Sequence, residues 1–179
     1  MGETRKISVD VETCMGCHTC EIACAVAHSE AKDLMQAYIN GERPGYRIYV
    51  EAFGTTPVPV PCNHCEEAAC VAACPTGAAN RKTEGGPVFI DKDRCIGCSM
   101  CVQACPFGMV NVSAVTKTAY KCDLCIERLA AGEQPACVSS CPTGSLSFST
   151  GEEANKGKRE KVAQMMAAAA ESGVKELEK

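Results

Sequence analysis

The chain has 179 residues and a formal net charge of −4, and its sixteen cysteines stand beside four phenylalanines, four tyrosines and no tryptophan. So few large apolar side chains predict a thin hydrophobic core, and small domains with thin cores need disulfides or bound metal. Acidic and basic residues are mixed along the chain, so no basic stripe predicts nucleic acid as a partner.

The first ten residues carry no apolar signal region, and the longest uninterrupted apolar run, Met165–Ala170, is far too short to cross a bilayer. We therefore expect a cytoplasmic chain with no direct membrane span, unless a partner that carries a signal exports it. A cytoplasmic chain so rich in cysteine indicates metal binding rather than disulfides.

The first predicted element is a short strand in which Ile7, Val9 and Val11 alternate with polar residues. A cysteine run with the spacing C-x2-C-x2-C-x3-C follows, and Ala25 comes directly after its fourth cysteine. Because a proline at that place would stop a helix, we expect the helix that begins near Cys20 to run past Cys24. The cysteines of this first run are Cys14, Cys17, Cys20 and Cys24.

Residues 46–53 are rich in β-formers and predict a strand, whereas the proline-rich segment 55–61 predicts an extended connector at a domain boundary. The second run reads C-x2-C-x4-C-x3-C, with two extra residues between its second and third cysteines, and Pro75 follows it. Its members are Cys62, Cys65, Cys70 and Cys74.

Segments 78–82 and 87–91 flank Glu84-Gly85-Gly86 and predict a β-hairpin. The third run, Cys95–Pro106, has the spacing C-x2-C-x2-C-x3-C and ends in Cys-Pro, which is the bacterial ferredoxin pattern for a [4Fe-4S] cluster. Three thiolates two residues apart can wrap one cubane in a tight loop, while the fourth points elsewhere. The third run contains Cys95, Cys98, Cys101 and Cys105, and a strand is predicted at 108–112.

The fourth run has a second gap of eleven residues, which predicts a helix that ends at Gly132 and then a turn at Pro135. Residues 145–149 predict a final strand. The cysteines of the fourth run are Cys122, Cys125, Cys137 and Cys141, followed by Pro142.

From Gly151 onward the tail holds no cysteine and predicts an amphipathic C-terminal helix, because its apolar residues recur at helical spacing. We expect this stripe to pack against its own domain, and a docking helix for another subunit is the alternative. The stripe consists of Val162, Met165, Met166, Ala169, Ala170, Val174 and Leu177.

Four cysteine quartets form an internal repeat, and each quartet is half of a two-cluster ferredoxin. The sequence therefore predicts an α+β fold of two bacterial-type two-cluster ferredoxin modules plus a C-terminal amphipathic helix. The fourth cysteine of each run ligates the cluster of its partner run. Adjacent runs two and three form the obvious pair, so the inner module (55–112) is nested inside an outer module (1–54 and 113–150), with 151–179 as the tail. Sequential pairing, run one with two and three with four, is the alternative that the spacings leave open.

The nested pairing assigns all sixteen cysteines to four [4Fe-4S] clusters and leaves none as a nucleophile or other catalytic residue. The four ligand sets are Cys14, Cys17, Cys20 and Cys141; Cys122, Cys125, Cys137 and Cys24; Cys62, Cys65, Cys70 and Cys105; and Cys95, Cys98, Cys101 and Cys74.

Structural zinc is the main alternative for these cysteines, but zinc sites typically use two separated C-x2-C pairs for each ion. His18 and His64 lie inside cysteine loops and could tune a cluster through hydrogen bonds, although an ordinary loop role is the simpler expectation. Four cations near the runs either offset cluster charge or form a solvated face. These cations are Lys92, Arg94, Lys117 and Lys121.

Four quartets in this order, with a widened second and fourth run, resemble the four-cluster electron-transfer subunits of the dimethyl sulfoxide reductase superfamily over about residues 5–150. The compact size and the stretch Cys20–Leu34 are similar to the small branch that serves carbon monoxide dehydrogenase, hydrogenases and tungsten aldehyde oxidoreductases. The resemblance implies nested modules, with the outer module facing a large catalytic subunit. Ala25 departs from the family pattern, and the absence of a membrane-facing extension counts against a quinone-linked membrane partner.

We therefore expect an electron-transfer subunit that is not an enzyme alone and relays single electrons through four [4Fe-4S] clusters. By resemblance, its catalytic partner is a tungsten or molybdenum aldehyde oxidoreductase and its second redox partner a flavin subunit. A carbon monoxide dehydrogenase or hydrogenase setting is the runner-up. The rival function is an assembly scaffold that binds two partners or copies of itself and also transfers electrons.

Overall fold

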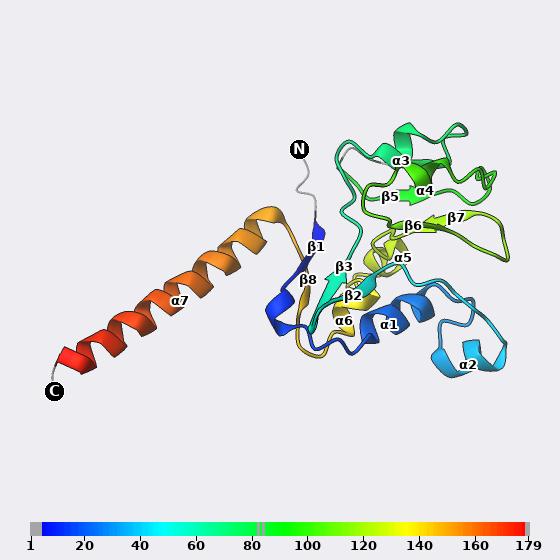
Figure 1. Cartoon of the computed structure of the whole chain (residues 1–179). Helices are drawn as coiled ribbons and strands as arrows, with labels where there is room; N and C mark the ends of the chain where they lie inside the picture. Colours follow the sequence, from blue (N-terminus) through cyan, green and yellow to red (C-terminus); the bar gives the residue numbers. More distant parts are fainter. Residues whose placement is uncertain (1–4, 82, 84, 178–179) are drawn as a thin grey trace.

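A computed structural model describes residues 5–81, 83 and 85–177, and the side chains of the C-terminal helix up to Ala169 (Figure 1). Two residues of the predicted hairpin, Lys82 and Glu84, lie outside this part of the chain. The side chains of Ala170, Val174 and Leu177 in the predicted tail stripe lie outside it as well.

Short helices and strands alternate along the body of the molecule. The helices are a 3-10 helix η1 (Val11–Thr13), α1 (Thr19–Ala27), α2 (Leu34–Ile39), α3 (Ala69–Ala72), α4 (Met100–Ala104), α5 (Ile126–Ala130), α6 (Ala136–Ser139) and α7 (Gly151–Leu177). The strands are β1 (Lys6–Val9), β2 (Tyr49–Phe53), β3 (Thr56–Val60), β4 (Ala79–Arg81), β5 (Val88–Ile90), β6 (Val110–Val112), β7 (Ala119–Lys121) and β8 (Leu146–Ser149).

The strands pair two by two into antiparallel ribbons, β1 with β8, β2 with β3, β4 with β5 and β6 with β7. The β1–β8 ribbon runs in register from Lys6 opposite Ser149 to Val9 opposite Leu146. This ribbon joins the segment before the first cysteine run to the segment after the last one, so the two ends of the body lie side by side.

Helices pack in pairs as well, α1 against α6 and α3 against α4. In Figure 1, α3, α4 and β5–β7 gather at one end of the body, while α1, α6, β1–β3 and β8 gather at the other. The first helix pair carries cysteines of runs one and four, and the second carries cysteines of runs two and three.

Cysteines form much of the buried core. One buried cluster joins Ile7, Ile48 and Leu146 to cysteines of runs one, two and four, and a second joins Val88 and Val110 to Cys70 and Cys101. The expectation of a core thin in large side chains is met, because the thiols occupy positions that larger apolar residues fill in an ordinary domain.

Several predicted elements are confirmed. Strand β1 lies where the alternating apolar residues predicted one, and the hairpin around Gly85-Gly86 is the β4–β5 ribbon. Helix α1 runs past Cys24 to Ala27, as the absence of a proline at position 25 predicts. The inserted helix α5 and the final strand β8 also form within the predicted segments.

The connector predicted at 55–61 is wrong, because most of it forms strand β3 in a hairpin with β2. Pro57 and Pro59 alternate with Val58 and Val60 along β3. Alternate residues of an antiparallel strand turn their N–H groups toward and away from the partner, so both prolines place their missing N–H on the open edge. Two prolines in alternation are therefore compatible with a two-stranded ribbon.

The prediction that the apolar stripe of the tail helix packs against its own domain is also wrong for the described side chains. Helix α7 projects away from the body (Figure 1), and Val162, Met165 and Met166 are 54%, 72% and 68% exposed. The first turns are tied to the body through ion pairs of Glu153 with Arg5 and of Lys161 with Asp10. None of the described helices combines the length and apolar character needed to cross a bilayer.

Candidate functional site

The four cysteine runs share one local construction. The third cysteine of each run is the second residue of a short helix, in α1, α3, α4 and α6 respectively. The residue before the second cysteine has a left-handed backbone in every run, with φ of 69° at Gly16, 45° at His64, 68° at Gly97 and 60° at Leu124. This repeated turn folds each loop back on itself, so that its cysteines face one space.

Three cavities are each lined by four cysteines, three from one run and one from another. We call them the 14/141 site (Cys14, Cys17, Cys20, Cys141), the 62/105 site (Cys62, Cys65, Cys70, Cys105) and the 74/95 site (Cys74, Cys95, Cys98, Cys101). Each cavity contains one of the sets expected from the nested pairing, and its walls otherwise carry mostly small or apolar side chains. Binding of one cluster by each set stays a prediction.

The remaining set, the 24/137 site (Cys24, Cys122, Cys125, Cys137), is buried throughout. Burial raises the pKa of the Cys137 thiol, and the neighbouring Cys24 and Cys125 thiols raise it further. Cys24 and Cys137 lie on α1 and α6, which pack together. The structure therefore also brings these four cysteines near one another.

The buried thiols have raised pKa values, because burial disfavours the charged thiolate. Burial raises the pKa of Cys20 to about 11 and that of Cys24 to about 12. Burial also raises the thiol pKa values of Cys70, Cys101, Cys122 and Cys125. Bound iron would have to displace these protons, because a coordinating thiol is deprotonated by its metal.

Spacing between the ligand atoms distinguishes a cluster from a single metal ion. A tetrahedral zinc ion with Zn–S bonds of about 2.3 Å brings its sulfurs to about 3.8 Å from one another. All sixteen cysteines are described, and no three of their sulfurs lie within 4.8 Å of one another. The sets are therefore too wide for one zinc ion, and their all-thiol composition fits a [4Fe-4S] cluster.

Backbone N–H groups point at several of the thiols. The fourth cysteines of runs two and three each accept one from a residue shortly after them, Ala79 to Cys74 at 3.3 Å and Met109 to Cys105 at 3.5 Å. Cys95 accepts one from Ala119 at 3.3 Å. Such donors stabilise a negatively charged sulfur, so they favour the thiolate that iron requires.

Three less buried thiols show the effect of such donors on the pKa. The hydroxyl of Thr19 lowers the pKa of Cys17. Burial acts to raise the pKa of Cys74 and Cys141. Hydrogen bonds from the backbone N–H groups of Ala79 and Leu146, together with those from Thr76 and Thr143, outweigh burial, and both pKa values are lowered.

A polar network lies against the 24/137 site. Asp123 accepts from His28 Nε2 at 3.1 Å and from the backbone N–H of Cys125 at 2.9 Å, and it pairs with Arg47. Burial acts to raise the pKa of Asp123, but His28 and Arg47 outweigh it and lower the pKa well below its usual range. The network ties the end of α1 and the segment between α2 and β2 (residues 40–48, the crossover segment) to the loop of run four.

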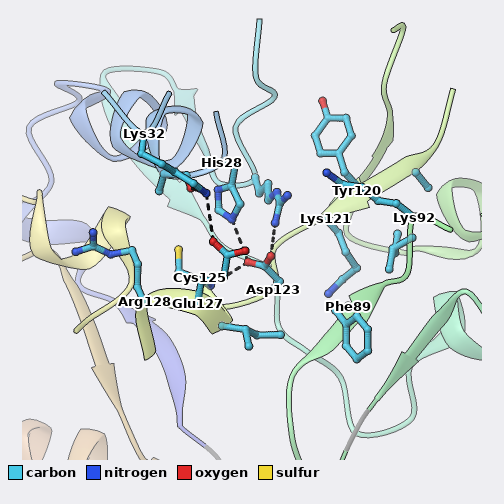
Figure 2. Close-up of a pocket in the computed structure, with 15 residues that line it drawn as sticks. His28, Lys32, Phe89, Lys92, Tyr120, Lys121, Asp123, Cys125, Glu127 and Arg128 are labelled. Carbon is cyan, nitrogen blue, oxygen red and sulfur yellow. Dashed lines mark hydrogen bonds and ion pairs between the residues drawn. The ribbon is translucent and has the colours of Figure 1, made fainter. Parts of the chain in front are cut away.

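These polar groups line a pocket of about 350 Å³ (Figure 2). In Figure 2, His28 points at Asp123, and Lys32 points at Glu127. His28, Asp123 and Cys125 place ligand atoms within 4.8 Å of one another. Since Cys125 belongs to the 24/137 site and Arg47 already pairs with Asp123, this group is part of the surroundings of that site.

The four cations named from the sequence lie in two different environments, three at the surface and one buried. Lys92, Arg94 and Lys117 are exposed and fit a solvated face. Lys121 is only 4% exposed, and its ammonium donates to the carbonyl oxygens of Val88 and Cys122 at 2.7 and 2.8 Å. This buried charge lines the 62/105 site and adjoins Cys122 of the 24/137 site.

The two loop histidines also differ. His18 is exposed, and its Nδ1 pairs with Glu21 Oε2 at 2.9 Å. His64 is 2% exposed and lines the 62/105 site, and burial lowers its pKa to about 3. The ordinary loop role fits His18 and does not fit His64.

Sequence reasoning missed Arg47, Asp123 and the role of His28. Asp123 could have been noticed as an acid inside the C-x2-C of run four. Arg47 and His28 carried no signal, because their contacts depend on how the crossover segment folds across run four.

Comparison with known proteins supports the metal assignment. A family model described as a 4Fe-4S dicluster domain matches residues 54–151, and a second, described as a 4Fe-4S binding domain, matches residues 11–27. The cofactors of this chain are [4Fe-4S] clusters.

Curated relatives match most of the chain. The thiosulfate reductase electron transfer subunit PhsB of Salmonella typhi is 43% identical over 78% of this chain and 72% of its own length. One of the polypeptides of the anaerobic dimethyl sulfoxide reductase of Escherichia coli (strain K12) is 36% identical over 83% of this chain and 74% of its own length. A chain of the solved active-site complex BamBC of benzoyl coenzyme A reductase is 22% identical, with a TM-score of 0.44 over 95% of this chain and 98% of that one. On the two curated matches and the dicluster model, the chain belongs to the ferredoxin-type [4Fe-4S] electron-transfer subunits that include the iron–sulfur subunits of thiosulfate reductase and dimethyl sulfoxide reductase.

Proposed function

We propose that the chain is a one-electron relay with four [4Fe-4S] clusters, one in each of the 14/141, 24/137, 62/105 and 74/95 sites. Each bound cluster supplies a one-electron couple whose potential depends on hydrogen bonds, charge and burial. The observation that carries this proposal is the convergence of cysteines from two runs on each cavity. Residues 14 and 141, far apart in the sequence, line one cavity, and this supports the nested pairing over the sequential one.

Electrostatic effects between thiols of different sites support a linear order. The Cys20 thiol raises the pKa of Cys137, the Cys62 thiol raises that of Cys122, and the Cys70 thiol raises that of Cys101, each in addition to burial. These neighbours link the 14/141 site to the 24/137 site, that site to the 62/105 site, and the 62/105 site to the 74/95 site. The order places the 14/141 and 74/95 sites at the two ends.

The solvent exposure of the cysteines also places the 14/141 and 74/95 sites at the two ends of the relay. Cys17 of the 14/141 site and Cys98 of the 74/95 site are exposed, and every other cysteine is buried or half-buried. Electrons would therefore enter and leave near these two thiols, each next to a different protein partner.

We propose that a large catalytic subunit performs the chemistry, because the named relatives are electron-transfer chains of reductase complexes. A reductase is the favoured class, because the named relatives include electron-transfer chains of thiosulfate and dimethyl sulfoxide reductases. A tungsten or molybdenum aldehyde oxidoreductase, a carbon monoxide dehydrogenase and a hydrogenase are the alternatives. A flavin subunit is one candidate for the second redox partner. Purification of the native complex under anaerobic conditions, followed by identification of the large subunit and its metal, distinguishes them.

Iron and sulfide analysis of the anaerobically purified protein tests the relay. Sixteen iron and sixteen sulfide per chain are expected from four clusters, with EPR signals after dithionite reduction. Zinc in place of iron would contradict the proposal. Cys14→Ser and Cys141→Ser should remove the same EPR signal, and Cys74→Ser should remove a different one. A shared loss between Cys14→Ser and Cys74→Ser would favour sequential pairing instead.

A scaffold role is a second candidate, favoured by the projecting helix α7 and its exposed methionines. Deletion of residues 152–179 tests it, because the body keeps every cysteine. A smaller assembly mass in light scattering, at unchanged iron content, would support assembly through α7. An unchanged mass would exclude α7 as the assembly element.

A further inference from the structure

His64 occupies a position that no other polar side chain shares in the four runs. Its counterparts before the second cysteine are Gly16, Gly97 and Leu124. All four are left-handed, and only His64 can donate a side-chain hydrogen bond. The side chain is buried and forms part of the wall of the 62/105 site.

A hydrogen bond at one ring nitrogen fixes the tautomer of His64. The backbone N–H of Val88 donates to His64 Nδ1 at 3.0 Å. A ring nitrogen that accepts a hydrogen bond carries no proton, so Nδ1 is the bare nitrogen of a neutral imidazole. The proton of the neutral ring is therefore on Nε2.

The Nε2–H group has no hydrogen-bond partner among the described residues, although it is buried. The nearby ammonium of Lys121 cannot serve, because it is a donor and is engaged by Val88 and Cys122. A buried donor without an acceptor is destabilising, and such unpaired groups are rare in folded proteins. The wall position of His64 leaves the contents of the cavity as the acceptor.

We propose that His64 Nε2–H donates a hydrogen bond to a sulfur of the cluster in the 62/105 site and thereby raises the reduction potential of that cluster alone. The inference rests on the proposed function, since it requires a cluster in that site. Donation to sulfur stabilises the more negative, reduced state more than the oxidised one. The other three sites receive no histidine at the equivalent position, so the effect separates one cluster from its neighbours.

Three variants at this position separate donation to the cluster from the contact with Val88. His64→Asn keeps an acceptor near the place of Nδ1 and removes the distal donor. His64→Gln keeps an N–H near the place of Nε2. His64→Leu removes both groups, and Leu124 shows that a leucine is accommodated in the same left-handed position of run four.

The measurement is an EPR-monitored redox titration of the full chain, together with ENDOR spectra in H2O and D2O. His64→Asn and His64→Leu should lower the potential of one cluster, with about a tenfold change in its reduced-to-oxidised ratio, or about 59 mV for one electron. An exchangeable proton coupling of the same cluster should disappear in both. His64→Gln should retain the coupling and lie closer to the wild-type potential.

Two results would overturn the inference. One is an unchanged potential and proton coupling in His64→Asn at full iron content. The other is an equal shift in His64→Gln and His64→Leu, because the lost Val88 contact would then explain the effect. Failure of the proposed function looks different, because Cys62→Ser and Cys105→Ser in the otherwise wild-type chain would then remove no common EPR signal.

Discussion

The backbone N–H of Arg47 donates to the Cys24 thiol at 3.3 Å, across 23 positions of the sequence. In runs two and three the corresponding donor comes from a residue four or five positions after the fourth cysteine. The difference follows from Ala25, because helix α1 continues through it and leaves no turn after Cys24 to supply an N–H. The crossover segment returns across the end of run one and supplies the donor instead.

The continuation of α1 predicts that Ala25→Pro is destabilising, although proline stands at this place in the other three runs. Proline inside a helix removes a backbone hydrogen bond and clashes with the preceding turn, at a cost of about 3 kcal/mol or more. Thermal unfolding of the iron-loaded protein should show a clearly lower Tm. Pro75→Ala is the matched control, because α3 has already ended before that residue. An Ala25→Pro variant with wild-type Tm and iron content would contradict this account.

The close approach of Lys117 to Gly97 predicts that the third run requires a residue without a side chain at position 97. A β-carbon there would clash with the carbonyl oxygen of Lys117, and φ is +68°. Gly108 has nearly the same φ, +65°, but open space around it. Gly108→Ala should therefore cost only the backbone strain of about 1–2 kcal/mol, whereas Gly97→Ala should cost more and lower the iron content. Equal Tm shifts for the two variants would show that the approach of Lys117 is not limiting.

The buried pair of Arg47 and Asp123 predicts an asymmetric double-mutant cycle. Arg47 is 11% exposed, so Asp123→Ala leaves its charge buried without a partner, at a cost of about 3–5 kcal/mol. Adding Arg47→Met should recover part of the lost Tm, because the unpaired charge is then gone. Glu127→Ala is the control, since its pair with Lys32 is exposed and such pairs contribute about 0–1 kcal/mol. Additive effects of Asp123→Ala and Arg47→Met would contradict the coupling.

The exposure of Cys17 and Cys98 predicts two phases of iron loss when the protein is oxidised in the presence of a chelator. About half of the iron should leave quickly from the 14/141 and 74/95 sites, because solvent reaches those thiols first. The remainder should leave slowly, and a denaturant should merge the two phases. Samples taken after the fast phase should retain the EPR signal that His64→Asn shifts. A single phase in the absence of denaturant would contradict the distinction between end sites and inner sites.

Local features of the fold were readable from the sequence because they depend on neighbouring residues. The absence of proline at position 25 predicted the continuation of α1, and Gly85-Gly86 predicted the β4–β5 hairpin. The prolines of 55–61 were misleading, because their compatibility with a strand depends on which edge of the ribbon they face. The stripe of α7 predicted a helix correctly, but helical spacing carries no information on what covers it.

The sequence by itself determined that this is an iron–sulfur protein, because cysteine spacing limits which thiols one local loop can present. It also supplied the candidate ligand sets, through the rule that fourth cysteines cross between runs. Only the tertiary structure decided which other groups reach those thiols. Arg47 meets Cys24, Lys121 is buried beside Cys122, and His64 lies in the wall of the 62/105 site, where Val88 donates to its Nδ1 and its Nε2 has no partner among the described residues. Burial and hydrogen-bond partners arise from that packing, and they are the quantities that set thiol acidity and cluster potential.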